Sequence, residues 1–249
     1  MSKKQVIILF GPPGAGKGTQ GELLAEKLNL YYFETSKILE QTFRLADPSP
    51  SAKGEGAKES PERFIEVGKE KYDILNERDL WVKGALCSPP FVTHLVKEKI
   101  KQLSSEGKNL LLSGSPRTFG EAKELIPLLK ELYGKENIKT ILIDVSPEET
   151  IFRNSHRRLC ELMRHPILYN KETEKLANCP LDGSKLKKRK GLDEPETIKI
   201  RLKEYKERTL PLIEYFEKEG IEVKKINGEQ SVADVYKDVL KAIEVRPPR

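Results

Sequence analysis

A glycine-rich turn near the start of the chain constrains the fold more than any other feature. The turn reads Gly-Pro-Pro-Gly-Ala-Gly-Lys-Gly-Thr over Gly11–Thr19, and the apolar segment Gln5–Phe10 precedes it. A short apolar run that stops at a glycine is typical of a buried strand. The residues that follow, Gly16–Leu28, carry Leu23, Leu24 and Leu28 on one face of a predicted helix. The segment therefore predicts a strand, a phosphate-binding loop and a helix in succession.

The composition of this loop suits a nucleoside triphosphate. Glycines let backbone N–H groups approach phosphates closely, and the N-terminus of the following helix adds partial positive charge. Lys17 is placed to reach the terminal phosphates. Thr19 comes one residue later than the usual hydroxyl residue because Gly18 intervenes, so the loop is a variant of the strict pattern. The alternative is an ordinary tight turn, which the glycines, the lysine and the context disfavour.

The rest of the chain alternates between short apolar runs and helical patterns. The predicted strands after the loop are 110–112, 141–145 and 221–226, and the predicted helices are 92–103, 120–132, 147–158, 196–218 and 231–244. Ser231 is a candidate N-cap for the last helix, with Asp234 three residues later. Such alternation predicts an α/β fold with parallel strands and helical crossovers.

Two stretches interrupt the alternation. Residues 47–61 are rich in Pro, Ser, Gly, Lys and Glu and predict a mobile loop. Residues 160–192 are irregular and basic, and Lys185–Lys190 is almost wholly cationic.

Charge and cysteine content bound the setting of the protein. The net charge of +6 fits either a solvated surface or affinity for a polyanion, and charge alone does not separate these. Three cysteines, Cys87, Cys160 and Cys179, argue against a disulfide framework and for a reducing compartment. The sequence shows no signal peptide and no run of membrane-spanning length. We therefore expect a cytoplasmic protein.

Several motifs occur in an order that matches one known family. They are GPPGAGKGTQ at the loop, LLSGSPRT at Leu111–Thr118, the arginine-bearing Ile151–Arg158, DEPETIKIRL at Asp193–Leu202 with Tyr205 following, and PLIEYF at Pro211–Phe216. The chain resembles the adenylate kinases and related nucleoside monophosphate kinases, as a divergent member. The matches span almost the whole chain.

The resemblance implies a P-loop NTPase core with a doubly wound parallel sheet and two inserted subdomains. The implied core comprises residues 1–34, 84–156 and 193–249. The insert that binds the nucleoside monophosphate (NMP) comprises 35–83, including the segment 47–61, and the lid comprises 157–192.

The resemblance also implies the reaction: transfer of the terminal phosphoryl group of ATP, with Mg²⁺, to a nucleoside monophosphate. The implied catalytic residues are Lys17, Arg117, Arg157 and Arg201, aided by one of Arg189 or Lys190. Arginine suits this chemistry because its fork meets two phosphate oxygens and stays charged. The implied ATP-binding residues are Gly11, Pro12, Pro13, Gly14, Ala15, Gly16, Lys17, Gly18, Thr19, Arg153 and Arg157. The implied NMP-binding residues are Thr35, Arg44, Gly114, Arg117 and Glu121.

Three departures from the family pattern affect the acceptor side and the metal. Ser113 replaces the acid that helps to hold magnesium, which leaves Thr19, the phosphates or another acid such as Asp144. Glu40 stands where an arginine is expected, and Arg44 follows one helical turn later. Glu121 replaces a glutamine that reads adenine, and a carboxylate suits the two donors of guanine better. Glu121 is alternatively only an exposed helix residue.

The lid cysteines raise the question of a structural metal. Some family members hold zinc on a Cys-x2-Cys and a Cys-x2-Cys/Asp set. Here Met163 replaces the second cysteine of the first pair, three residues after Cys160, while Cys179 and Asp182 of the second pair remain. A thioether is a poor zinc ligand, so we expect an eroded site without tight zinc, although His165 could complete the set by moving in.

The alternatives differ in acceptor and in activity. Adenylate kinase is the default, a kinase for GMP or a pyrimidine monophosphate is the alternative, and a nucleotide-binding protein with degraded kinase activity is the next. A nucleic-acid-associated ATPase ranks last, because the basic lid suits closure over phosphates. We expect no nucleic-acid or membrane partner and a monomeric state.

Overall fold

A computed structural model describes residues 4–46, 63–82, 87–189 and 193–243 of the 249-residue chain. The central strands are β1 (Val6–Phe10), β2 (Tyr31–Phe33), β5 (Leu110–Ser113), β6 (Ile138–Asp144) and β10 (Val223–Asn227). They pair in parallel in the order β10-β6-β1-β5-β2. All five residues of β1 are buried, which explains why its sequence is apolar throughout rather than alternating.

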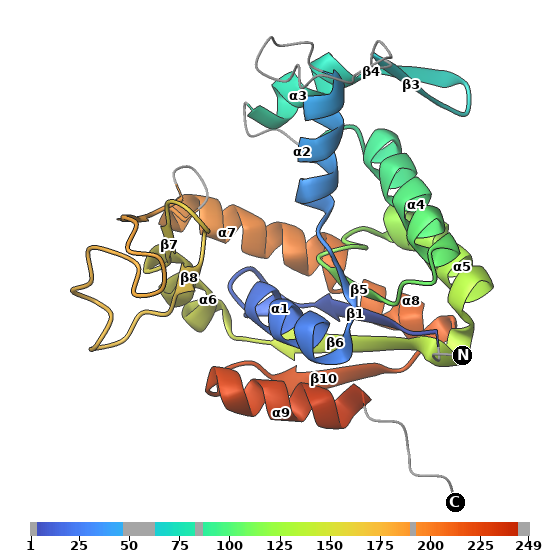
Figure 1. The fold of residues 1–249 in the computed structure, drawn as a ribbon. Helices are drawn as coiled ribbons and strands as arrows, with labels where there is room; N and C mark the ends of the chain where they lie inside the picture. The colour runs from blue at the N-terminus through green and yellow to red at the C-terminus, as the bar shows by residue number, and fades with distance from the viewer. Residues whose placement is uncertain (1–3, 47–62, 83–86, 190–192, 244–249) are drawn as a thin grey trace, which may run out of the picture.

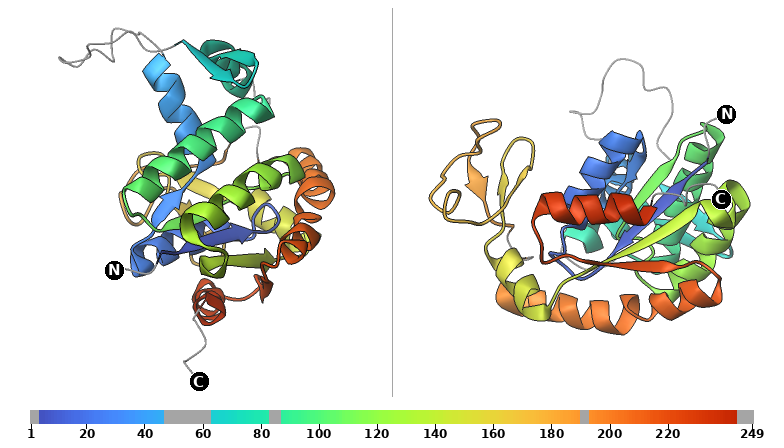
Figure 2. Two further views of the ribbon diagram at one scale, coloured as in Figure 1. Left: turned by 90° about the vertical axis from the view of Figure 1, so that its right-hand side faces the viewer. Right: turned by 90° about the horizontal axis from the view of Figure 1, so that it is seen from below.

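Helices cover both faces of this sheet, as Figure 1 and Figure 2 show. The helices are α1 (Lys17–Leu28), α4 (Pro89–Ser105), α5 (Phe119–Tyr133), α8 (Leu212–Lys218) and α9 (Val232–Ile243). α1 and α9 pack with Ile7 and Leu9 on one face, whereas α4, α5 and α8 pack with Val6 and Ile8 on the other. The predicted α/β class and doubly wound parallel sheet are therefore confirmed.

Two groups of elements stand away from the sheet (Figure 1). The first contains α2 (Thr35–Ala46), the hairpin of β3 (Phe64–Val67) and β4 (Glu70–Asp73), and α3 (Ile74–Val82). The second contains β7 (Arg158–Cys160), β8 (Pro166–Ile167) and β9 (Leu186–Lys187) of the lid, between α6 (Pro147–Ser155) and α7 (Pro195–Glu204). The proposed division into core, NMP-binding insert and lid follows these groups and stays a prediction. The segment 47–61, expected to be mobile, lies outside the described residues.

Two helices differ from the sequence prediction, one by an internal π-helical turn and one by an earlier end. The helix predicted over 196–218 is broken by a π-helical turn at Tyr205–Thr209, in which Leu210 N–H donates to the Tyr205 carbonyl at 2.9 Å. The helix predicted to reach Arg158 ends at Ser155, because Arg158 already pairs within the lid sheet. Both differences lie beside the elements that carry the candidate site.

The ends of the other helices follow local chemistry. The predicted N-cap is confirmed, since Asp234 N–H donates to the Ser231 hydroxyl at 3.2 Å.

Within the ranges given above, no helix has both the length and the apolar character needed to cross a membrane.

The two neighbouring leucines of α1 provide a matched test of core packing. Leu24 is fully buried, whereas Leu23 is 38% exposed, so the two leucines differ in burial although the sequence places them on one face. Leu24→Ala should lower the free energy of unfolding by about 2–5 kcal/mol, because it leaves a cavity beneath the sheet. Leu23→Ala should change it by less than about 1 kcal/mol. Urea unfolding measures both, and equal losses would contradict this packing.

Candidate active site

The glycine-rich loop occupies the turn between β1 and α1, at the carboxyl end of the central strand. β5 and β2 lie on one side of β1 in the sheet, and β6 and β10 lie on the other. The order of the strands therefore reverses at β1, and open α/β sheets bind ligands in the crevice at such a point. Gly16 precedes α1 and has no side chain to cap it, which leaves the first N–H groups of the helix to a ligand. The loop is therefore shaped as an anion site.

Close packing beneath the loop explains one of its glycines. Gly14 adopts φ +82°, and a Cβ there would lie 2.4 Å from Nδ2 of Asn154 on α6. Asn154 and Thr150 are fully buried, and Asn154 Nδ2 donates to the Thr150 carbonyl at 2.7 Å. α6 thus supports the loop from below.

Lys17 lies folded onto the loop that precedes it. Its Nζ donates to the carbonyls of Gly11 and Pro12, at 2.8 Å each. Burial lowers the pKa of Lys17 from 10.5 to about 7, and the nearby charges of Arg117, Arg201 and Arg157 lower it further in that direction. The ammonium group is held in a place where positive charge is disfavoured until an anion arrives.

Four arginines share this region with Lys17, and we call the five residues the cation cluster: Lys17, Arg117, Arg157, Arg189 and Arg201. Burial, followed by the charge of Arg189, lowers the pKa of Arg157 to about 10. Burial, again followed by Arg189, lowers the pKa of Arg201. The cluster joins the loop after β1, the turn after β5, the two ends of the lid and helix α7. Such convergence of cations suits a polyphosphate.

Asp193 supplies a counter-charge to three members of the cation cluster. Its buried carboxylate accepts two hydrogen bonds from Arg189, at 3.0 Å from Nε and 2.6 Å from NH2. It also acts against the lowering of the pKa values of Arg157 and Arg201. Asp193 therefore holds the Arg189 guanidinium in a fixed orientation. Lys190, the alternative to Arg189 in the sequence, lies outside the described residues.

The turn after β5 holds Arg117 by its backbone as well as its side chain. Arg117 Nε donates to the Gly114 carbonyl at 2.5 Å, and Gly114 adopts φ +77°. A Cβ on Gly114 would lie 2.9 Å from an Arg117 guanidinium nitrogen, so only glycine fits there without a shift. The Thr209 hydroxyl, in the π-helical turn, donates to the Arg117 carbonyl at 2.9 Å.

Glu121 contacts the same turn. Its carboxylate accepts from Arg117 N–H at 2.9 Å and from the Ser115 hydroxyl at 3.4 Å. Glu121 N–H in turn donates to the hydroxyl of Thr118, the N-cap of α5, at 3.2 Å. Glu121 is thus a part of the Arg117 turn and not merely an exposed helix residue.

Fewer of the residues expected to bind the nucleoside monophosphate, which we call the acceptor side, lie near the cation cluster. Thr35 lies at the start of α2, and its buried hydroxyl has no hydrogen-bond partner within the described part of the chain. Glu40 and Arg44 are exposed on α2, and Arg44 is not among the charges that lower the pKa of Lys17. The structure therefore does not bring Arg44 to the cation cluster.

Tyr32 occupies the position beside Ser113, where the family has an acid. The Tyr32 hydroxyl hydrogen-bonds Ser113 and Glu34, and burial raises its pKa to about 12. The ring lies so close to α1 that a Cβ on Gly21 would come within 2.5 Å of it. Asp144, the other acid considered for magnesium, pairs with Lys225 at 2.7 Å.

Arg153 and Thr19 complete the donor side. Arg153 on α6 pairs with Glu149 at 2.6 Å, and its charge lowers the pKa of Glu229, after the hydrogen bonds from Ser146. Thr19 lies in the first turn of α1 and is partly buried.

Sequence reasoning missed three residues that shape the site: Tyr32, Asn154 and Thr209. A signal existed for Asn154, because Thr150 and Asn154 are polar residues four positions apart, one behind the other in the predicted helix 147–158. Tyr32 and Thr209 act through contacts with residues distant in sequence, which no local pattern shows.

Comparison with known proteins adds an independent finding. The family model described as adenylate kinase matches residues 66–221. An adenylate kinase of Petrotoga mobilis is 35% identical over 237 residues, covering 94% of each chain. The chain belongs to the adenylate kinase family. Adenylate kinases of Caldicellulosiruptor saccharolyticus and Methanothrix thermoacetophila are each 32% identical, over 96% and 95% of this chain and 99% and 97% of theirs.

Family membership confirms the resemblance stated from the motifs and the phosphotransferase class. The adenylate kinase family model begins at residue 66, so the glycine-rich loop contributes to the assignment only through the full-length relatives. The roles of individual residues remain predictions.

Because the pKa of Lys17 is lowered, we predict that the protein takes up a proton when it binds ATP. At pH 8 the free protein keeps Lys17 largely neutral, because its pKa is about 7. The charge of bound triphosphate should raise this pKa well above 8, so binding should take up about one proton more than in Lys17→Met. Titration calorimetry in buffers of different ionisation enthalpy measures the uptake.

Lys17→Arg is the matched control, because it keeps the cation but stays charged in both states. It should bind ATP without the extra proton. Equal uptake by the wild type and both variants would contradict a neutral Lys17 in the free protein.

Proposed function

We propose that this protein is an adenylate kinase, which transfers the terminal phosphoryl group of ATP to AMP and forms two molecules of ADP. The observation that carries the proposal is the convergence of the cation cluster on the glycine-rich loop. Phosphoryl transfer needs little covalent chemistry from the protein. It needs both nucleotides placed in line and the charge on the moving group neutralised.

Each side chain has a proposed part in the transfer. Lys17 follows the terminal phosphate, moving from the carbonyls of Gly11 and Pro12 to the phosphate oxygens. Arg117 holds the phosphate of the monophosphate, since the Gly114 and Thr209 contacts fix its turn. Arg157 and Arg201 neutralise the moving group from the opposite side.

ATP enters as its magnesium complex, and the metal ion neutralises part of the phosphate charge. Thr19 is the proposed contact to that ion, from the first turn of α1. Ser113 offers a hydroxyl where the family has a carboxylate, and Tyr32 already occupies it. We therefore propose that the phosphates of ATP hold the ion with little help from protein carboxylates.

The remaining predictions concern the setting of the enzyme. We propose that it works as a monomer in the cytoplasm. The three cysteines are all free and buried in the structure, which suits a reducing compartment.

The reaction is tested by supplying ATP and Mg²⁺ with AMP, GMP, CMP or UMP and measuring diphosphate products. AMP should give ADP fastest. Arg201→Met should lower this rate by about a hundredfold or more, because a partly buried cation proposed to stabilise the transferring group is lost. Lys203→Met on the same helix removes an exposed cation, 74% accessible at its side chain, and should change the rate less than about twofold.

Two outcomes would contradict the proposal. ATP binding without any diphosphate product would indicate a nucleotide-binding protein that has lost transfer. Faster turnover with GMP would favour the second candidate, a guanylate-preferring kinase, for which the carboxylate of Glu121 is the specific observation.

Glu121 gives the acceptor question its own test. A carboxylate accepts hydrogen bonds only, whereas an amide also donates, as N1 of adenine requires. Glu121→Gln should therefore raise kcat/KM for AMP relative to GMP by roughly tenfold, the value of one hydrogen bond. Steady-state kinetics with both acceptors measure the ratio.

Glu124→Gln is the control, one turn along α5, where the side chain is exposed and pairs with Lys97 at 2.7 Å. It should leave the ratio unchanged. If Glu121→Gln also leaves the ratio unchanged, Glu121 acts only on the Arg117 turn and not on the base.

A further inference from the structure

The helix that carries Arg201 is interrupted by the π-helical turn at Tyr205–Thr209, and Pro211 gives a physical reason for the interruption. Proline has no backbone N–H, and in a regular α-helix its ring clashes with the carbonyl four residues earlier. The chain widens instead, so that Leu210 N–H donates to the carbonyl five residues back at 2.9 Å. Single π turns inside helices occur frequently at functional sites.

The π-helical turn changes which residues share a face with Arg201. In a regular α-helix, at about 100° per residue, Thr209 would lie about 80° around the axis from Arg201. The π turn takes up one more residue than an α turn, which brings Thr209 to within roughly 20° of Arg201. Burial agrees with this rotation, since Arg201, Tyr205 and Thr209 are all half-buried, whereas residues 206–208 are exposed.

The same turn leaves the Thr209 hydroxyl available to another element. In an α-helix, a threonine hydroxyl can donate to the carbonyl four residues earlier. Here that carbonyl belongs to Tyr205 and already accepts from Leu210 N–H. The Thr209 hydroxyl donates instead to the Arg117 carbonyl at 2.9 Å, 92 positions away in the chain. The other two hydrogen bonds of Arg117 described above lie within its own turn, whereas this one comes from a different element.

The Thr209 contact joins two elements whose cations repel one another. The charge of Arg117 helps to lower the pKa of Arg201, after burial and the charge of Arg189. The charges of Arg117 and Arg201 also lower the pKa of Lys17, for which burial is the largest cause. Like charges this close tend to move apart when no phosphate lies between them. A hydrogen bond from the element of Arg201 to the backbone of Arg117 opposes that movement.

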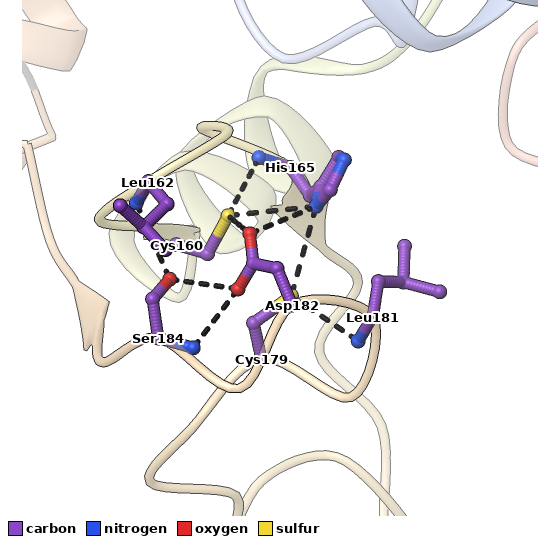
Figure 3. A network of polar contacts seen from close by, with 7 residues as sticks. All are labelled: Cys160, Leu162, His165, Cys179, Leu181, Asp182 and Ser184. Carbon is purple, nitrogen blue, oxygen red and sulfur yellow. Dashed lines mark hydrogen bonds and ion pairs between the residues drawn. The ribbon is translucent and has the colours of Figure 1, made fainter.

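The other two arginines of the cation cluster stand at the ends of the lid, which has contacts of its own. Figure 3 shows a polar network between the turn after β7 and the turn before β9. It includes the side chains that the sequence suggested for a metal ion, together with a histidine: Cys160, Cys179, Asp182 and His165. Cys160 Sγ lies 3.0 Å from Asp182 Oδ2 and 3.5 Å from His165 Nδ1. These lid residues lie outside the elements that carry Arg117 and Arg201, so the spacing of that pair is a separate matter.

We infer that Thr209 is a positioning residue for the transfer: its hydroxyl, brought inward by the π-helical turn, sets the distance between Arg117 and Arg201. The inference rests on the proposed function, in which Arg117 holds the acceptor phosphate and Arg201 neutralises the moving phosphoryl group. A fixed distance between these two groups helps to align the acceptor with the phosphoryl group that it receives. Loss of the contact should therefore impair use of the acceptor and spare the binding of ATP at the glycine-rich loop.

The test begins with two substitutions that differ in the hydroxyl group. Thr209→Val removes the hydroxyl and keeps the branched shape, and it should lower kcat/KM for AMP by about three- to tenfold, the range of one neutral hydrogen bond. Its dissociation constant for ATP, measured by calorimetry without AMP, should stay within about twofold of the wild type. Thr209→Ser keeps the hydroxyl and should retain both values.

Two further comparisons separate positioning from a general effect on the fold. The matched control is Thr140→Val on β6, because the Thr140 hydroxyl is buried and has no hydrogen-bond partner among the described residues. It should leave kcat/KM for AMP unchanged. In an Arg117→Met background, Thr209→Val should change kcat/KM by less than about twofold, because the group that it positions is gone. Thr209→Ala also removes the hydroxyl and replaces Thr209→Val if that variant does not fold.

Proton uptake gives a readout that does not need phosphoryl transfer. If Thr209 holds Arg117 near Lys17, Thr209→Val lets Arg117 move away, and the pKa of Lys17 in the free protein rises. Lys17 is then protonated more often at pH 8 before ATP arrives, so this variant should take up fewer protons with ATP than the wild type or Thr209→Ser. This measurement still applies if the wild type forms no diphosphate, a result that would contradict the proposed function alone.

Any of three outcomes would overturn the inference. Thr209→Val could leave both kcat/KM for AMP and proton uptake unchanged. Thr209→Ser could lose as much as Thr209→Val, in which case the hydroxyl is not the cause. Finally, Thr209→Val could weaken ATP binding as much as it lowers kcat/KM for AMP, which would indicate a general disturbance of the fold.

Discussion

The cost of withdrawing cations from solvent and placing them beside one another is the constraint on which the rest of the site depends. Holding Lys17 protonated against a pKa lowered from 10.5 to about 7 costs on the order of 5 kcal/mol at low pH, comparable to the whole stability of many domains. The cation cluster is carried on separate elements of the fold, and Asp193 acts against the lowering of the pKa values of Arg157 and Arg201. A polyphosphate removes the repulsion, so the site is electrostatically incomplete without its ligand.

The donor side and the acceptor side of the site differ in how far they are built. On the donor side the loop, Lys17 and Asn154 are already in close contact. On the acceptor side, the Thr35 hydroxyl is buried without a partner in the described residues, and Arg44 is exposed. This is the pattern expected where one substrate binds a preformed loop and the other binds a surface that is assembled around it.

How far the sequence predicted this structure depended on the range of the contacts involved. The loop, β1 and α1 were predictable because the buried strand, the glycines and the helix are consecutive in the sequence. β2 was missed, since Tyr31–Phe33 has only three residues and is too short to show a pattern. The π-helical turn was missed because its wide hydrogen bond leaves no sign in the pattern of apolar residues. The sequence left the approach of His165 to Cys160 and Cys179 as an option only. This approach depends on the backbone turn at Arg164 and on residues about fifteen positions further along the chain.

Arg157 and Arg189 stand at opposite ends of the lid, where the chain leaves α6 and where it returns toward α7. Figure 1 shows the lid loops extending outward from the region of α6 and α7. In a lever, positions near the pivot sweep a short arc and the tip sweeps a long one. If the lid rotates about these two ends, the guanidinium groups travel little while the outer loops travel far. With the roles proposed above, binding of the phosphates would lie at the pivot and shielding from water at the tip, so the two tasks would be mechanically separate.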